Sequence, residues 1–189
     1  MEKELKQISH TNSNCVKVVL YGPESTGKSS LAKALAKYYD TVYVEEFSRT
    51  YAKAQRNLRL TRKDVLPIAI GQMQLENEQL KIANKVLICD TDLLETKVYS
   101  EFYYDGFCPE LVKKKALENT YDLYFLTYID IVWEADDVRD QPNNRLEMFN
   151  RFEYALIHSK KPYIMVKGDL EERLKICKKH IDKLLNKAH

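Results

Sequence analysis

Short apolar runs alternate along the chain with longer stretches in which apolar residues recur at helical spacing. Five runs are typical of buried strands, because they are short, apolar and bounded by polar or turn-forming residues. They cover residues 16–21, 41–44, 86–89, 123–126 and 163–166. Valine-rich runs without polar alternation favour a parallel sheet that is covered on both faces.

The stretches between these runs have the apolar spacing of helices that pack against a sheet. In residues 28–39, for example, Leu31, Ala34, Leu35 and Tyr38 fall on one helical face. The other predicted helices are 47–56, 64–84, 93–103, 109–119, 146–159 and a C-terminal helix that runs to about Lys187. Strands that alternate with helices predict an α/β fold, here a five-stranded parallel sheet with helices on both faces.

The chain length sets the number of domains. A chain of 189 residues is long enough for one domain with a real core and too short for two catalytic domains. Residues 1–14 are polar and predict a flexible N-terminal tail, which leaves residues 15–189 as the single domain. The charged, turn-prone stretch 136–145 predicts a lid, which we place near residues 134–151.

Charge and cysteine content narrow the class of protein. The net charge of +2 gives no overall attraction to nucleic acid or to an anionic membrane, so we expect neither partner. The cysteines have no metal-ligand spacing, and no apolar run has the length of a signal peptide core or a membrane span. These features predict a cytoplasmic protein with a small-molecule substrate, and they do not indicate an oligomeric state.

The strongest motif follows the first predicted strand. The segment Gly22, Pro23, Glu24, Ser25, Thr26, Gly27, Lys28, Ser29 fits G-x-x-x-x-G-K-[ST] at every fixed position, and Ser30 continues into the helix. Such a loop turns backbone N–H groups toward phosphate oxygens. The lysine reaches the β- and γ-phosphates, and the serine hydroxyl binds Mg²⁺. The motif predicts a P-loop NTPase that binds ATP and magnesium.

Acidic residues follow the second and third strands, at the edge where ligands bind in such sheets. Glu46 is a candidate base or substrate ligand, although glutamate also suits an ordinary helix start. Asp90 is placed as a magnesium ligand, and Asp90 or Asp92 as a partner of the attacking hydroxyl. Either aspartate could instead cap the next helix.

Arginines in the predicted lid are candidates to cover the transferred phosphoryl group. Arg139 and Arg145 lie in a turn-rich segment before a helix, although a solvated loop would have the same composition. A guanine-reading N-K-x-D motif is missing, because Leu87 stands where Asn84 and Lys85 would require aspartate. A small-molecule kinase is therefore favoured over a GTPase.

Several segments together resemble the ribosylnicotinamide kinase domain of NadR-type proteins. They are the loop with Pro-Glu-Ser-Thr at its centre, 46–49 with Tyr51, Gly71-Gln72, 90–99, 121–124 and 130–133. The resemblance covers residues from about 16 to 185. It implies a fold like that of nucleoside and nucleotide kinases, and transfer of phosphate from ATP to the 5′-hydroxyl of nicotinamide riboside.

The resemblance also implies residue roles. It places Glu46 and Arg49 near the riboside and Asp90 or Asp92 near the hydroxyl. Tyr128 and Trp133 are candidates to stack on the nicotinamide ring, with plain packing as the alternative for Trp133.

The sequence departs from the family pattern in three ways. It has no His-x-Gly-His motif and no room for an adenylyltransferase domain, so we expect a stand-alone kinase. Glu45 replaces an expected proline, and 136–139 has no glycine after the aspartate. A kinase of another nucleoside or metabolite, and an ATP-binding regulatory module without turnover, remain alternatives.

Overall fold

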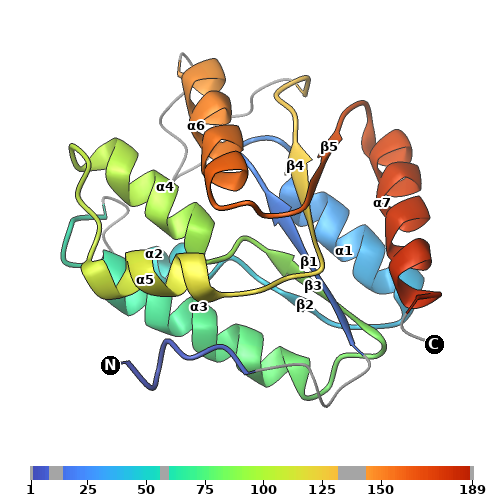
Figure 1. The fold of residues 1–189 in the computed structure, drawn as a ribbon, viewed down its shortest axis with the longest axis horizontal. Helices are drawn as coiled ribbons and strands as arrows, with labels where there is room; N and C mark the ends of the chain where they lie inside the picture. The colour runs from blue at the N-terminus through green and yellow to red at the C-terminus, as the bar shows by residue number, and fades with distance from the viewer. Residues whose placement is uncertain (1, 9–14, 56–59, 132–143, 188–189) are drawn as a thin grey trace.

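The computed structural model describes residues 2–8, 15–55, 60–131 and 144–187. Five strands and seven helices follow one another in these ranges (Figure 1). The strands are β1 (Val16–Tyr21), β2 (Tyr43–Val44), β3 (Val86–Asp90), β4 (Leu123–Thr127) and β5 (Tyr163–Val166). The helices are α1 (Lys28–Tyr39), α2 (Phe47–Ala54), α3 (Val65–Leu80), α4 (Leu93–Tyr103), α5 (Glu110–Glu118), α6 (Arg145–His158) and α7 (Leu170–Leu185).

The strands form one sheet in the order β2-β3-β1-β4-β5, and every neighbouring pair is parallel. The predicted fold class is thus confirmed. The chain leaves β1 toward β2 and β3 on one side and later returns to β4 and β5 on the other. The order therefore reverses at β1, and ligands of such sheets bind beyond the carboxyl ends of the strands at this point.

Alternate residues of β1 serve two separate cores. Val18 and Leu20 pack with α1 and α7, whereas Val19 and Tyr21 pack with the core that includes α3, α4, α5 and α6. Figure 1 shows the same division, with α1 and α7 on one face of the sheet and the other helices opposite. All six residues of β1 are buried, Lys17 included, as expected for a central strand of a parallel sheet covered on both faces.

The first residues correct the prediction of a flexible tail. Leu5 is fully buried in the core, and the Ile8 N–H donates to Asn77 of α3 at 2.8 Å. The Gln7 amide donates to Glu76 at 2.8 Å, where Glu76 also binds the buried Lys17 ammonium at 2.8 Å. Residues 2–8 therefore belong to the domain, because they complete a buried polar network.

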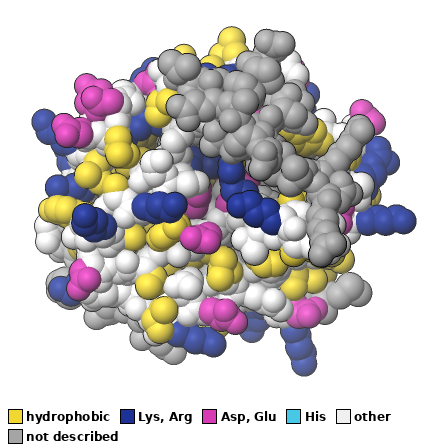
Figure 2. Space-filling view, turned by 180° about the vertical axis from the view of Figure 1, so that it is seen from behind, with side chains coloured by type: hydrophobic (Ala, Val, Ile, Leu, Met, Phe, Trp, Pro, Cys, Tyr) yellow, Lys and Arg dark blue, Asp and Glu magenta, His cyan; other side chains and the backbone are white. Residues whose placement is uncertain are grey.

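The described surface has mixed character. Lys and Arg side chains are interspersed with acidic and apolar ones over the face drawn in Figure 2. Among the described helices, none is both long enough and apolar enough to cross a bilayer.

Candidate active site

The P-loop connects β1 to α1 and depends on its two glycines. Gly22 and Gly27 have φ of 138° and 78°, a region in which side chains are strained. A Cβ on Gly22 would also lie 2.8 Å from the Thr127 hydroxyl oxygen. No side chain caps the N-terminus of α1, so its first N–H groups are left to face an anion.

The Lys28 ammonium lies between the loop and α4. Its Nζ donates to the Gly22 carbonyl at 2.6 Å and the Pro23 carbonyl at 2.9 Å, and it lies 3.2 Å from Glu95 Oε1. The second oxygen of Glu95 accepts from the Gly22 N–H at 3.3 Å. The lysine is buried, so its charge acts at the loop with little screening.

Ser29 and Asp90 meet beneath the loop. Ser29 lies close enough to the Asp90 carboxylate to lower its pKa, and Asp90 Oδ1 has no hydrogen-bond partner among the described residues. Burial, together with Glu46, raises the Asp90 pKa to about 6 against the opposing effect of Lys28. An unpaired buried carboxylate oxygen beside a hydroxyl fits Mg²⁺, which takes few protein oxygens and completes its shell with phosphates and water.

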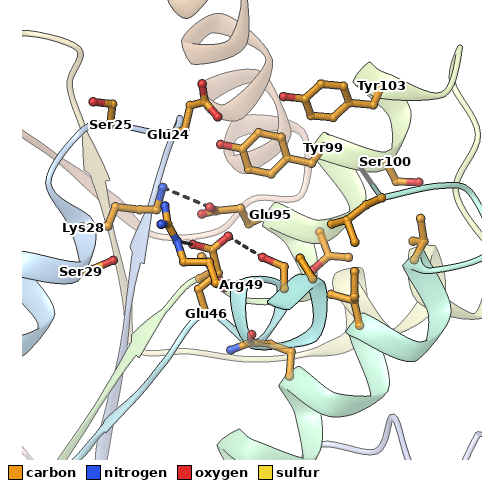
Figure 3. Close-up of a pocket in the computed structure, with 18 of the residues that line it drawn as sticks. Glu24, Ser25, Lys28, Ser29, Glu46, Arg49, Glu95, Tyr99, Ser100 and Tyr103 are labelled. Carbon is orange, nitrogen blue, oxygen red and sulfur yellow. Dashed lines mark hydrogen bonds and ion pairs between the residues drawn. The ribbon is translucent and has the colours of Figure 1, made fainter. Parts of the chain in front are cut away.

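A cleft of about 730 Å³ opens from the P-loop toward α2, α3 and α4. Its phosphate end contains residues 24–30, and its opposite end is apolar and aromatic. Figure 3 shows Tyr99 and Tyr103 on one wall, beyond Glu95. The apolar and aromatic lining consists of Ala52, Leu60, Val65, Ile68, Tyr99, Tyr103 and Tyr104.

Glu46 stands between these two ends. Its carboxylate accepts from Arg49 Nε at 2.8 Å and from the Ser48 hydroxyl at 2.6 Å (Figure 3). Burial raises the Glu46 pKa, but Lys28, Arg49 and Ser48 outweigh it, and the net pKa is lowered. Glu46 is therefore a carboxylate at neutral pH.

The start of α2 is fixed against α3. The Gln72 amide accepts from the Phe47 N–H at 2.8 Å and donates to the Glu45 carbonyl at 3.2 Å. A Cβ on Gly71 would overlap the Phe47 ring, so only glycine lets α2 pack this closely. This explains the Gly71-Gln72 pair.

Residues 17–173 match the family model described as an AAA domain. The chain belongs to this family. Two curated relatives, the trifunctional NAD biosynthesis/regulator protein NadR of Salmonella typhimurium and that of Escherichia coli K12, are each 32% identical over 125 residues. These matches cover 65% of this chain but only 30% of each relative, so the chain spans less than a third of their length.

Solved structures give the same fold. A NadR protein in complex with NR matches 92% of this AAA domain chain and 53% of its own chain, with a TM-score of 0.76 and 19% identity. Deoxyadenosine kinase from M. mycoides with bound dATP matches 88% of this chain and 99% of its own, with a TM-score of 0.57 and 15% identity. The resemblance to NadR-type proteins and the P-loop kinase fold are thereby confirmed.

Asp92 lies outside the cleft of this AAA domain. Its Oδ1 accepts from the Glu95 N–H at 2.9 Å, and its Oδ2 accepts from the Tyr124 hydroxyl at 2.7 Å. Asp92 is thus the N-cap of α4, with both oxygens directed into the core. Of the two roles considered for Asp92, the geometry supports the helix cap. Asp90 differs, because one of its carboxylate oxygens has no hydrogen-bond partner among the described residues.

The predicted lid and ring-stacking residues divide into three cases. Arg145 begins α6 and donates to the Ser25 carbonyl at 3.3 Å, so it does reach the P-loop. Tyr128 does not line the cleft, because its ring packs edge-on against Phe149 at 5.0 Å between centroids. Arg139 and Trp133 lie outside the described residues.

Sequence reasoning gave no role to Glu95, Tyr99 or Tyr103. They are spaced four residues apart, so they share one face of α4 and all line the cleft. Burial, with the nearby carboxylates, raises the Glu95 pKa well above its usual value, against the effect of Lys28. The four-residue spacing of these three residues, on the helix that follows the third strand, is the sequence feature that could have identified them.

Proposed function

We propose that this chain transfers the γ-phosphoryl group of ATP to the 5′-hydroxyl of nicotinamide riboside. One observation carries the proposal: a single cleft joins the P-loop to an aromatic wall, with the ionised Glu46 between them. A nucleoside with its ring against the tyrosines would direct its 5′-hydroxyl toward the loop. The similarity to NadR proteins, one of them in complex with NR, supports this acceptor.

The chain's own groups suit an in-line transfer. The 5′-oxygen forms a bond to the γ-phosphorus while the bond to the bridging oxygen of ADP breaks, and Glu46 accepts the hydroxyl proton. Arg49 holds the Glu46 carboxylate, and Lys28 stabilises charge on the phosphoryl oxygens. Ser29 and Asp90 would hold Mg²⁺, which neutralises phosphate charge when bound.

The positions of two further side chains suggest roles for them in the transfer. Arg145 is proposed to approach the phosphates, because it already contacts the Ser25 carbonyl. Glu95 is proposed to orient the Lys28 ammonium from α4, which faces the loop across the cleft. Asp92, which caps α4, has no chemical role in this proposal.

The test is a steady-state comparison of acceptors with the purified chain, ATP and Mg²⁺. Nicotinamide riboside should give a higher kcat/KM than adenosine, deoxyadenosine, cytidine or thymidine. Lys28→Ala should abolish the signal, and Lys33→Ala, an exposed lysine on the same helix, should not. A higher kcat/KM for another nucleoside would identify that nucleoside as the acceptor instead. ATP binding without turnover of any acceptor would contradict the proposal that the chain is a kinase.

A further inference from the structure

A buried arginine ties α7 to the back of the P-loop. Arg173 is 1% exposed, and its guanidinium donates to three backbone carbonyls. The acceptors are Gly168 at 2.7 Å, Thr26 at 2.6 Å and Tyr128 at 3.1 Å, and the guanidinium also pairs with the Asp130 carboxylate. One side chain therefore joins the P-loop to the segments that follow β4 and β5.

The bond to Thr26 fixes a peptide unit of the P-loop. The Thr26 carbonyl and the Gly27 N–H belong to one planar trans peptide, so they point in opposite directions. Because Arg173 holds the carbonyl, the Gly27 N–H points away from Arg173. Gly27 lines the cleft and Arg173 is not among the lining residues, as expected if the Gly27 N–H is directed into the cleft.

The charge on Arg173 adds to this geometric effect. A charge-assisted hydrogen bond is shorter and stronger than a neutral one, and it polarises the peptide that accepts it. Polarisation of the Thr26 carbonyl makes the Gly27 N–H a better donor. Gly27 has a φ of 78°, which glycine adopts without strain.

We propose that Arg173 is a positioning residue for the triphosphate of the donor nucleotide. It acts through the Thr26–Gly27 peptide, whose N–H it orients toward the phosphates. The inference rests on the proposed use of ATP but not on the identity of the acceptor. It assigns the donor site a residue from α7 that is 147 positions from Thr26 in sequence.

The test measures binding of two probes, AMP-PNP and inorganic tripolyphosphate, each with Mg²⁺, by calorimetry. Arg173→Lys keeps the positive charge but cannot make all four contacts. Both probes should bind about tenfold more weakly to this variant, which is the size expected for losing one charged hydrogen bond. Weakening of AMP-PNP alone would overturn the proposal, since it would place the effect at the adenine.

Two controls separate positioning from stability. Arg151→Lys changes an exposed arginine of α6 that pairs with Glu147, and Ile181→Val trims the buried face of α7 away from the loop. Both should bind the two probes as the unchanged chain does. Equal weakening in Ile181→Val and Arg173→Lys would overturn the proposal, because it would show a general effect of α7.

A second variant covers the case in which Arg173→Lys fails to fold. Asp130→Ala removes the partner carboxylate, whose side chain is 30% exposed, and leaves Arg173 in place. We expect about threefold weaker binding of both probes, since the guanidinium loses one of its anchors. Unchanged binding would overturn the proposal. Neither probe needs an acceptor, so failure of riboside phosphorylation would leave these readouts intact.

Discussion

The two ends of the cleft are built in different ways. The phosphate end is one continuous loop, held by glycine conformations, backbone hydrogen bonds and the buried Lys28. The aromatic end collects side chains from α2, residues 60–61, α3 and α4, which lie up to about 50 positions apart. In the proposed kinase, a local motif therefore specifies donor binding, whereas acceptor specificity depends on how distant helices pack. Substitutions at the two ends should separate these functions.

The largest effect is expected at the phosphate end. Lys28→Ala should lower kcat by about 1000-fold, since it removes the buried charge that stabilises the phosphoryl group in transfer. Single-turnover rates measure this directly. Lys33→Ala is the matched control on the outer face of α1. A Lys28→Ala rate within tenfold of the unchanged chain would contradict the P-loop assignment.

The next effect lies at the junction of the two ends. Glu46→Gln should lower kcat by about 100-fold, because an amide cannot accept the hydroxyl proton. Glu45→Gln is the neighbouring control, since Glu45 is exposed and its carboxylate accepts from the Tyr43 hydroxyl at 2.9 Å. If the two variants turned over equally fast, the base would have to be sought elsewhere, with Asp90 first.

At the aromatic end, the effect should fall on the acceptor alone. Tyr99→Leu should raise the KM for the riboside roughly tenfold, as expected for loss of one aromatic contact with a base, and leave the KM for ATP unchanged. Tyr38→Leu changes an exposed tyrosine of α1 and serves as control. A rise in both KM values would show that the two ends are not separable.

The smallest effect on turnover is expected at Asp92. Burial raises the Asp92 pKa to about 6, against hydrogen bonds from Glu95 and Tyr124 that favour the carboxylate. The folded state therefore holds a proton that the unfolded state releases near pH 4, so this group stabilises the fold at low pH and loses that contribution as pH rises toward 6.

Asp92→Asn keeps a cap and removes this titration. Turnover should stay within about threefold, and the pH dependence of the unfolding free energy between pH 4 and 6 should become shallower. Urea titrations at several pH values measure it. Asp90 has a pKa raised to about the same value, so part of the slope should remain. A 100-fold loss of turnover in Asp92→Asn would show that Asp92 takes part in the reaction.

The sequence predicted those features that local chemistry determines. The P-loop, the strand runs and most helix bounds follow from glycine positions and apolar spacing, and α1 and β5 fall on their predicted residues. The prediction of a flexible tail is wrong for residues 2–8. In the sequence, Leu5 and Gln7 stand among polar residues, and only the fold brings this segment to the Lys17–Glu76 pair.

The candidate site was predictable only in part. Glu46 and Asp90 were candidates because each follows a strand at the ligand edge, and the N-cap geometry of Asp92 distinguishes it from Asp90. Glu95 and Tyr99 required the packing of α4 against the loop, and Arg173 required the return of α7 to the same edge. Such contacts join residues far apart in sequence, and one sequence carries no signal of which pairs meet.

Product stoichiometry tests the central claim most directly. The purified chain is mixed with ATP, Mg²⁺ and nicotinamide riboside, and ADP and nicotinamide mononucleotide are quantified together by mass spectrometry. The account predicts that both products form in equal amounts, and that Lys28→Ala forms them about 1000-fold more slowly. Release of ADP without nicotinamide mononucleotide, or formation of neither product by the unchanged chain, would contradict the account.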